Sequence, residues 1–406
     1  MPVGGVVALT LKAISGIRIG TASAGISQTI RDDVTVFELA AGTQVAAVFT
    51  KNKFCAAPVT LAKKHLKDSA AKYLLINSGN ANAGLGDLGL VSAQQCCQGL
   101  ADVAKVEAMN VLPFSTGVIG EPFPVDKLTA VLQDAVNNVA EDNWPSAAKA
   151  IMTTDTCEKG CSRTFELNDA EVTITGIAKG SGMIHPNMAT MLSYIATDMP
   201  IQQELLQTML SEAADASFNR ITVDGDTSTN DAVVLMATSK VDVPLIDSQD
   251  DARYGLFLSK LKEVCCYLAE AIVRDGEGAT KLINIQVENA RSEQDAKEVA
   301  YTIAQSPLVK TAFFASDPNW GRILAAVGRA NIASLNVDKV SIYLNDVCIV
   351  DAGKRAEDYT EEQGQAVMNK EEITVRVCLA QGDYKSSVLT CDLSYDYVKI
   401  NAEYRS

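Results

Sequence analysis

Short runs of alternating or β-branched residues, separated by longer stretches with helical spacing, constrain the fold of this chain most. The runs predict strands at 34–39, 44–50, 72–76, 171–177, 232–237 and 282–288. Helical periodicity predicts helices at about 90–109, 125–140, 202–216, 255–273 and 293–305. Because strands and helices come in mixed order without a strict βαβ rhythm, a layered α/β or α+β architecture is favoured over an all-α or all-β one.

The C-terminal third has three further strand patterns, at 339–350, 372–379 and 386–394. The last two flank Gln381-Gly382-Asp383, so we expect an antiparallel hairpin there. A chain of 406 residues exceeds one ordinary hydrophobic core, and two packed lobes are expected. With 47% hydrophobic and 21% charged residues, both lobes have enough apolar material to fold.

Charge and hydropathy exclude several classes of partner. A net charge of −15 would repel nucleic acid and anionic lipid surfaces, so we expect neither as a partner. No apolar run reaches the roughly 20 residues that span a bilayer, and the start of the chain lacks the pattern of a signal peptide. We therefore expect a cytoplasmic protein whose ten scattered cysteines are reduced thiols.

The two histidines, His65 and His185, limit the available catalytic chemistry. His65 lies in a basic segment that reads as a solvated face, and His185 precedes a proline in a glycine-rich loop, where a structural role and a catalytic base are the alternatives. A histidine zinc site is nearly excluded, and Cys157-x3-Cys161 has no second pair. Gly180-Ser181-Gly182 fits neither nucleotide-binding motif. We expect no metal and no cofactor.

The stretch 179–198, KGSGMIHPNMATMLSYIATD, places a glycine-rich loop ahead of a strand-like segment that begins at Thr190. A hydroxyl nucleophile needs a base, and an N-terminal threonine supplies one, because its α-amine has a pKa of about 8. Thr190 would become N-terminal if its Oγ attacked the Ala189 carbonyl and the resulting ester were hydrolysed. The alternative is a glycine-rich turn with only a structural purpose.

The same stretch resembles the self-cleavage segment of the ornithine acetyltransferase family, the ArgJ enzymes of arginine biosynthesis. Other stretches agree in order: 50–52 (TKN), 77–83 (NSGNANA), 115–120 (STGVIG), 151–156 (IMTTDT), 224–231 (DGDTSTND), 275–278 (DGEG) and 317–322 (DPNWGR). The resemblance covers nearly the whole chain. It departs at Leu85, where a threonine is expected, and at Cys157-Glu158, where a small or proline-containing continuation is more usual.

The resemblance implies a layered αββα-type sandwich with two lobes, the N-terminal-nucleophile-like DmpA/ArgJ fold. It implies cleavage into an α chain, 1–189, and a β chain, 190–406, intertwined in one globular unit and associated as an α2β2 heterotetramer. Thr190 then takes the acetyl group from N2-acetyl-L-ornithine, releases ornithine and passes the acetyl group to L-glutamate. Some members of the family also accept acetyl-CoA.

The resemblance also assigns site residues. Thr116 and Gly117 match the pair that forms the oxyanion hole. Six residues match positions that hold substrate: Thr153, Lys179, Thr190, Glu277, Asn401 and Ser406. The charges fit an amino-acid ligand, with Lys179 for a carboxylate or the reaction centre and Glu277 for ornithine's ammonium. We interpret 226–231 and 317–322 as architectural turns.

Two rival functions remain open from the sequence. An N-terminal-nucleophile aminopeptidase or amidase would use the same Thr190 chemistry with water as the acceptor. An uncleaved ligand-sensing or structural protein would share the scaffold without the reaction.

Overall fold

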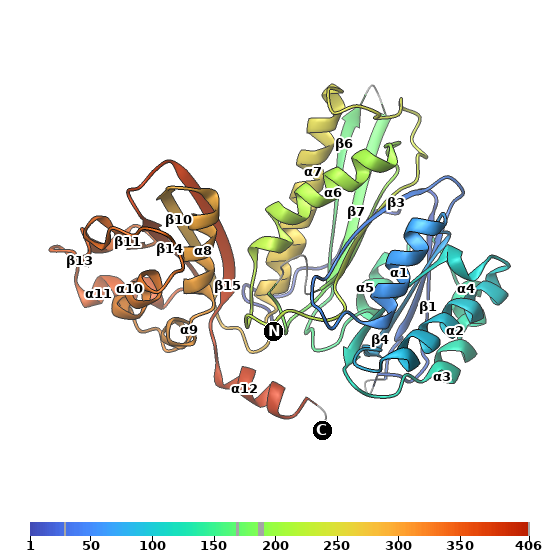
Figure 1. The fold of residues 1–406 in the computed structure, drawn as a ribbon, viewed down its shortest axis with the longest axis horizontal. Coiled ribbons are helices and arrows are strands. Elements are labelled where there is room, and N and C mark those ends of the chain that lie inside the picture. Colours follow the sequence, from blue (N-terminus) through green and yellow to red (C-terminus); the bar gives the residue numbers. More distant parts are fainter. Residues whose placement is uncertain (28–29, 168–169, 186–190, 405–406) are drawn as a thin grey trace. The chain divides into compact units, whose positions relative to one another are not determined.

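The computed structural model describes residues 1–27, 30–167, 170–185 and 191–404, and these form two compact units (Figure 1). The larger, which we call the sandwich unit, comprises residues 7–219 and 226–272. The smaller, which we call the C-terminal unit, comprises residues 273–406 together with 1–6 and 220–225. The expectation of two lobes from the length is confirmed.

The sandwich unit contains two sheets. The four-stranded sheet has the order β1 (Ile17–Ala22), β2 (Val34–Leu39), β4 (Tyr73–Asn80) and β5 (Val111–Val118), and only β4 and β5 are parallel. The five-stranded sheet has the order β3 (Gln44–Phe49), β9 (Ala232–Ala237), β8 (Leu192–Thr197), β7 (Ala170–Lys179) and β6 (Lys159–Leu167), and only β8 and β9 are parallel.

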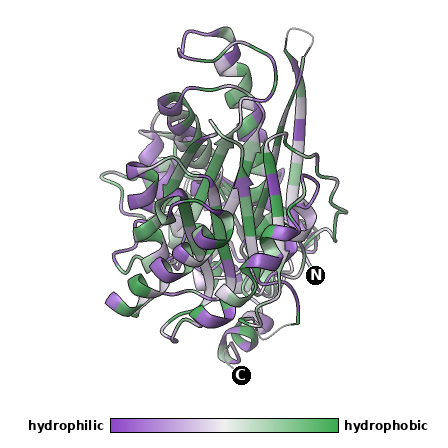
Figure 2. Cartoon of the chain, turned by 90° about the vertical axis from the view of Figure 1, so that its right-hand side faces the viewer, coloured by the Kyte–Doolittle hydropathy of each residue, from purple (hydrophilic) through white to green (hydrophobic). Residues whose placement is uncertain are grey.

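The two sheets pack face to face because successive side chains of a strand point to opposite faces. In β4, Leu74 and Ile76 enter the core between the sheets, whereas Tyr73 and Leu75 enter the core beneath the helices. Tyr194 of the five-stranded sheet completes the inner core, with its ring centroid 5.4 Å from that of Phe114 on the other sheet. Figure 2 shows these strands largely green, while purple concentrates on the outer helical turns.

Helices cover both outer faces of the sandwich (Figure 1). The four-stranded sheet packs against α2 (Asp87–Ala104), α3 (Val125–Ala130) and α4 (Leu132–Asn137), with α1 (Ala57–Asp68) along β5 and α2 and α5 (Trp144–Ala150) against both sheets. The five-stranded sheet packs against α6 (Gln203–Ala216) and α7 (Ala252–Arg274). The order helix, sheet, sheet, helix confirms the αββα-type sandwich.

The C-terminal unit has one six-stranded sheet. Its order is β13 (Lys354–Arg355), β12 (Val347–Asp351), β11 (Ser341–Leu344), β14 (Glu372–Cys378), β10 (Leu282–Ala290) and β15 (Tyr384–Cys391). Its helices are α8 (Glu293–Ala304), α9 (Pro307–Phe314), α10 (Trp320–Gly328), α11 (Glu361–Met368) and α12 (Tyr395–Ala402). Short 3-10 turns lie at Ala108–Asn110, Phe218–Arg220 and Val337–Lys339.

The hairpin that we predicted around 381–383 is wrong. β10 lies between β14 and β15, parallel to β14 and antiparallel to β15. The connection instead crosses the end of β10, where the backbone N–H groups of Gln381 and Gly382 both donate to the Asn289 carbonyl. The alternating Ile283, Ile285 and Val287 place β10 in the buried centre of the sheet, a position that the local turn signal could not reveal.

Two other predicted elements are divided. The helix expected at 125–140 is α3 and α4, separated at Val131. The strand expected at 339–350 is the antiparallel pair β11 and β12, which turns at Asn345 with a φ of 48°. Asparagine tolerates this left-handed conformation better than most residues, so it allows the chain to reverse inside an apolar run.

Candidate active site

Four strands of the sandwich unit bring polar residues to one end of the five-stranded sheet. Lys179 at the end of β7 pairs with Leu192 at the start of β8, and Leu192 pairs with Ala232 at the start of β9. Phe49 at the end of β3 also pairs with Ala232. Lys179, Met191, Asp231 and Thr50 therefore meet at this sheet end, which is the candidate site.

The predicted nucleophile Thr190 and its neighbour Ala189 lie outside the described residues, as does Ser406. The strand expected after Thr190 is present as β8. Its first neighbour, Met191, is buried and accepts a hydrogen bond of 3.1 Å from the Ala232 amide. The chain that follows residue 190 is thus fixed against β9.

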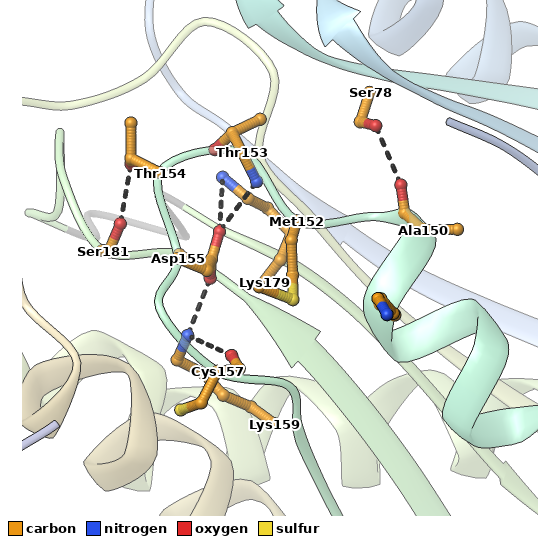
Figure 3. Close-up of polar contacts among 12 residues, drawn as sticks. Ser78, Ala150, Met152, Thr153, Thr154, Asp155, Cys157, Lys159, Lys179 and Ser181 are labelled. Carbon is orange, nitrogen blue, oxygen red and sulfur yellow. Dashed lines mark hydrogen bonds and ion pairs between the residues drawn. The ribbon is translucent and has the colours of Figure 1, made fainter. Parts of the chain in front are cut away.

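A buried charge cluster lies beside Lys179 (Figure 3). The Asp155 side chain is 0% exposed, and its Oδ1 accepts from Lys159 Nζ at 2.7 Å and from the Gly180 amide at 2.7 Å. Lys179 Nζ is 4.0 Å from Asp155 Oδ2. Burial alone would raise the pKa of Asp155, but the attraction of the two lysines holds that pKa well below its usual range. Two buried cations therefore share one carboxylate.

Thr153 belongs to the same cluster. Its amide donates to Asp155 Oδ2 at 2.9 Å, and the next residue, Thr154, bonds the Ser181 hydroxyl at 2.7 Å (Figure 3). The loop after α5 and the loop after β7 are consequently tied together. The structure brings the predicted residues Thr153 and Lys179 into one place through Asp155.

Thr116 and Gly117 lie at the end of β5 in the other sheet. Gly117 has a φ of 136°, and a Cβ there would be 2.2 Å from the Gly79 carbonyl carbon, so only glycine fits. Asn230 Nδ2 donates to the Ser115 carbonyl at 2.9 Å and to the Ala81 carbonyl. Because Asn230 precedes Asp231, this bond links the end of β5 to the candidate site.

Asp231 is a residue that we interpreted only as part of a turn. It is buried immediately before the apolar strand β9, and the Ser228 and Thr50 hydroxyls and the Met191 amide donate to its carboxyl group. Burial raises the pKa of this carboxyl well above its usual range, although these donors and the charge of Lys179 oppose the shift. The sequence feature that could have identified Asp231 is an acidic residue immediately before a fully apolar strand.

Glu277 and Asn401 contact each other within the C-terminal unit. Asn401 Nδ2, on α12, donates to Glu277 Oε2 at 2.7 Å and to the Tyr397 carbonyl at 3.0 Å. The turn that carries Glu277 packs tightly against the start of α12, because a Cβ on Gly278 would be 2.5 Å from Ser394 Oγ. This hydrogen bond attaches α12 to the turn that carries Glu277, and the substrate roles of Glu277 and Asn401 stay predictions.

His65, which the sequence placed on a solvated face, has a structural contact. Its Nδ1 is 2.8 Å from the Val111 carbonyl, so this histidine helps to join α1 to β5. All ten cysteines are free thiols.

In the described ranges no cluster of three or more histidine, cysteine or acidic residues could bind a metal. The same ranges contain no helix long and apolar enough to cross a membrane.

Comparisons with known proteins agree with this arrangement. The ArgJ family model matches residues 18–406. The arginine biosynthesis bifunctional protein ArgJ of Pseudomonas fluorescens is 53% identical over 98% of both chains. The protein of that name from Methylococcus capsulatus is 56% identical over 98% of this chain and 97% of its own. The crystal structure of the Bacillus halodurans protein has a TM-score of 0.51 and 39% identity, over 53% of this chain and 100% of the solved one.

Proposed function

Because this chain belongs to the ArgJ family, we propose that it transfers the acetyl group of N2-acetyl-L-ornithine to L-glutamate in arginine biosynthesis. The observation that carries the proposal is the match over residues 18–406, which includes every residue given a role below. Both curated relatives are named bifunctional, and we therefore include acetyl-CoA as a second acetyl donor. The substrates are small molecules, the reaction takes place in the cytoplasm, and no cofactor is required.

The precursor cleaves itself between Ala189 and Thr190. Thr190 Oγ attacks the Ala189 carbonyl carbon, the bond from that carbon to the Thr190 nitrogen breaks, and an ester forms. Water hydrolyses the ester, leaving a carboxylate on Ala189 and a free α-amine and hydroxyl on Thr190. In turnover the amine accepts the hydroxyl proton while Oγ attacks the acetyl carbonyl, and the departing ornithine nitrogen takes that proton.

The products of cleavage, 1–189 and 190–406, remain intertwined. The break falls between β7 and β8, which are paired strands of one sheet, so each product would keep strands of that sheet. The pairing of β7 with β8 supports the proposal that the cut is not a domain boundary. Assembly of the α and β chains as an α2β2 heterotetramer is part of the same proposal.

Thr116 and Gly117 form the oxyanion hole. A threonine hydroxyl and a glycine N–H can both donate to the tetrahedral oxyanion, and removal of one such donor costs about 3 kcal/mol of barrier. The close approach of Gly117 to Gly79 supports this role, because it fixes the backbone that carries the N–H. The bond from Asn230 to the Ser115 carbonyl keeps this strand end beside the start of β9.

Lys179 and Thr153 hold the substrate near Thr190. Lys179 Nζ lies 4.0 Å from Asp155 Oδ2, at the sheet end that precedes residue 190, and an ammonium group can pair with a carboxylate of the substrate. Acetylornithine and glutamate both carry such a carboxylate. Thr153 offers its hydroxyl while its amide is held by Asp155.

Glu277 and Asn401 are proposed to bind the ammonium of ornithine, with Ser406 beside them in sequence. The side-chain amide of Asn401 orients the Glu277 carboxylate at 2.7 Å. A carboxylate can form a charge-assisted hydrogen bond with an ammonium group.

Intact mass spectrometry of the purified protein after brief exposure to N2-acetyl-L-ornithine tests the proposal. We expect two fragments, 1–189 and 190–406, with one acetyl group on the fragment that begins at Thr190. Thr190→Ala should give one unbroken, unacetylated chain. The matched control is Thr208→Ala on α6, whose hydroxyl bonds the Glu204 carbonyl of its own helix, and it should behave as the wild type.

Two results would contradict the proposal. An unbroken wild-type chain that retains full turnover would exclude the N-terminal threonine mechanism. Release of acetate from acetylornithine at an equal rate with and without glutamate would indicate an amidase in place of a transferase.

A further inference from the structure

β5 is the last strand of its sheet, so one of its edges has no strand neighbour in the described part of the chain. The Val118 carbonyl faces β4, because it accepts from the Ala81 amide just beyond that strand. Backbone groups of alternate residues in an extended strand point to the same edge, so residues 113, 115 and 117 face the other, open edge. Pro113 agrees with this assignment, since a proline in a sheet has no N–H to pair and is found on edge strands.

Asn230 closes this open edge at Ser115. Its Nδ2 donates to the Ser115 carbonyl at 2.9 Å and to the Ala81 carbonyl at 2.6 Å. Its Oδ1 accepts from the Thr229 hydroxyl at 2.5 Å. A side-chain amide has two N–H groups, and here each has its own carbonyl. Asn230 is 5% exposed, so three hydrogen bonds in a buried place determine the direction of its side chain.

The segment that carries Asn230 is itself held against the chain that follows β3. Thr50 Oγ1 donates to the Ser228 carbonyl at 2.8 Å, and the Ala56 amide donates to the Thr229 carbonyl at 2.9 Å. The Asn230 amide donates to the Ser228 hydroxyl at 3.1 Å. A side chain on a segment supported in this way can hold its partners in place.

The two carbonyls that Asn230 contacts bracket the predicted oxyanion-hole pair, Thr116-Gly117. Ser115 directly precedes the pair. Ala81 holds the other side, because its amide donates at 2.9 Å to the carbonyl of Val118, which directly follows the pair. Along the open edge, the next N–H after the bonded Ser115 carbonyl is that of Gly117.

We propose that Asn230 is a positioning residue for the oxyanion hole, which fixes the direction of the Gly117 N–H by closing the edge of β5 at Ser115 and tethering Ala81. The inference rests on the proposed function, which assigns the oxyanion hole to Thr116 and Gly117. Under the proposed cleavage Asn230 would belong to the β chain and both carbonyls to the α chain. The same two bonds would then hold the two chains in register.

The tether has a chemical purpose in acyl transfer. Oxyanion donors lower the barrier because they are aimed at the developing charge before the reaction begins. The edge of β5 at Ser115 is fixed by a side chain in place of a neighbouring strand, and removal of that side chain would let the strand end shift. Misplacement by about 1 Å can cost roughly 100-fold in rate.

A crystal structure of the wild-type enzyme tests the tether directly. We expect Asn230 Nδ2 within about 3.2 Å of the carbonyl oxygens of Ser115 and Ala81. The Gly117 N–H should point at water or bound substrate. A Gly117 N–H bonded to another protein group, or an Asn230 side chain turned away from Ser115, would overturn the proposal. This measurement does not depend on any variant being folded.

Kinetics of Asn230→Ala test the function of the tether, with rates expressed per cleaved chain. We expect kcat for acetyl transfer to fall roughly 10- to 100-fold. KM for acetylornithine should stay unchanged, because Asn230 contacts protein carbonyls and not the substrate. The matched control is Asn143→Ala, which also removes an amide that donates to two carbonyls, those of Ile19 at 2.8 Å and Asn138 at 3.0 Å. Its kcat should equal the wild-type value.

A thioacetyl substrate separates positioning from a general loss of structure. N2-thioacetyl-L-ornithine places a sulfur atom where the oxyanion forms, and sulfur is a weaker hydrogen-bond acceptor than oxygen. The ratio of kcat/KM for the acetyl substrate to kcat/KM for the thioacetyl substrate therefore reports on the oxyanion hole. We expect this ratio to fall several-fold in Asn230→Ala and to keep its wild-type value in Asn143→Ala. A lower kcat with an unchanged ratio would indicate a merely structural role and overturn the proposal.

The outcomes separate this inference from the proposed function. A wild-type protein that is neither cleaved nor acetylated would refute the proposed function and this inference with it. A cleaved and acetylated wild type together with a wild-type kcat in Asn230→Ala would refute the tether alone. A folded Asn230→Ala chain that is not cleaved at all would place Asn230 in maturation and would also count against its role in acetyl transfer.

Discussion

Asp155 and Asp231 are two buried carboxyls of the same site, yet their surroundings drive their pKa values in opposite directions. Asp155 lies beside two lysines, which hold its pKa below the usual range in spite of burial. Asp231 has only neutral donors in direct contact, and burial raises its pKa well above the usual range. The comparison teaches that partners, more than depth, decide whether a buried carboxyl stays charged. Asp155 is therefore held in its charged form by its partners, whereas burial favours the neutral form of Asp231.

The largest effect is expected from removing the charge of Asp155. Asp155→Asn removes the carboxylate charge that both Lys159 and Lys179 approach, and removing one partner of a buried ion pair costs about 3–5 kcal/mol. Asp231→Asn should cost less than about 1.5 kcal/mol, because it removes no ion pair. Urea denaturation of both variants, made in the Thr190→Ala background, checks the difference. Equal losses of unfolding free energy in the two variants would contradict the expected difference between Asp155 and Asp231.

The two lysines of the cluster should differ from each other. Lys159 is 1% exposed and 2.7 Å from Asp155, whereas Lys179 is 10% exposed and 4.0 Å away. We expect Lys159→Met to lower the free energy of unfolding by about 3 kcal/mol and Lys179→Met by about 1 kcal/mol or less. Acetyl transfer should follow the reverse order of sensitivity, since only Lys179 is proposed to contact the substrate. Thermal unfolding with steady-state kinetics measures both.

The pH dependence of stability should have opposite signs for the two carboxyls. A lowered pKa, as for Asp155, gives stability that is present above the unfolded value of about 3.9 and is lost as the pH falls. A raised pKa, as for Asp231, gives stability that is present at low pH and is lost as the pH rises above about 3.9. In the uncleaved Thr190→Ala background, Asp231→Asn should therefore gain stability relative to its parent as pH rises from about 4 toward 7, by at most about 1.4 kcal/mol per pH unit.

Denaturation curves from about pH 2 to pH 7 cover both windows. Asp155→Asn should instead lose stability relative to the same parent as the pH rises toward about 3.9, and the difference should stay constant above that value. Slopes of the same sign for the two variants would contradict the assigned pKa directions.

The smallest effect on stability is expected at Glu277, a third buried carboxyl, which is held by a neutral amide. Asn401→Ala removes one hydrogen bond at the end of the chain and should cost less than about 1 kcal/mol. KM for acetylornithine should nevertheless rise several-fold if Glu277 binds the substrate ammonium. Lys399→Ala, an exposed position on the same helix, is the control and should leave KM unchanged. Deletion of 401–406 should have the larger effect on KM.

Local sequence patterns were sufficient to predict most of the strands near the candidate site. The strands predicted at 34–39 and 232–237 match β2 and β9 residue for residue, and the strand expected after Thr190 is β8. A continuous apolar run such as 232–237 is typical of a strand that is buried on both faces. The predicted residues Thr153 and Lys179 also meet in space, which the motif order alone could not show.

Local patterns could not predict which strands pair when they are far apart in the sequence. The turn at 381–383 looked like a hairpin, but β10, about 90 residues earlier in the sequence, occupies the place between the two strands. Asp231 looked like a turn residue because two of the donors to its carboxyl, Thr50 and Met191, are far away in sequence. A turn signal reports only neighbouring residues, whereas a buried contact depends on the whole packing.

The sequence by itself determined the alternation of strands and helices, the family, and the chemical types available for catalysis, since these follow from periodicity, ordered motifs and a count of two histidines. Only the tertiary structure decided which strand ends meet and which buried carboxyl keeps its charge. The physical reason is that a pKa and a hydrogen bond depend on burial and on the distance to partners, and both are set by packing between segments far apart in the chain.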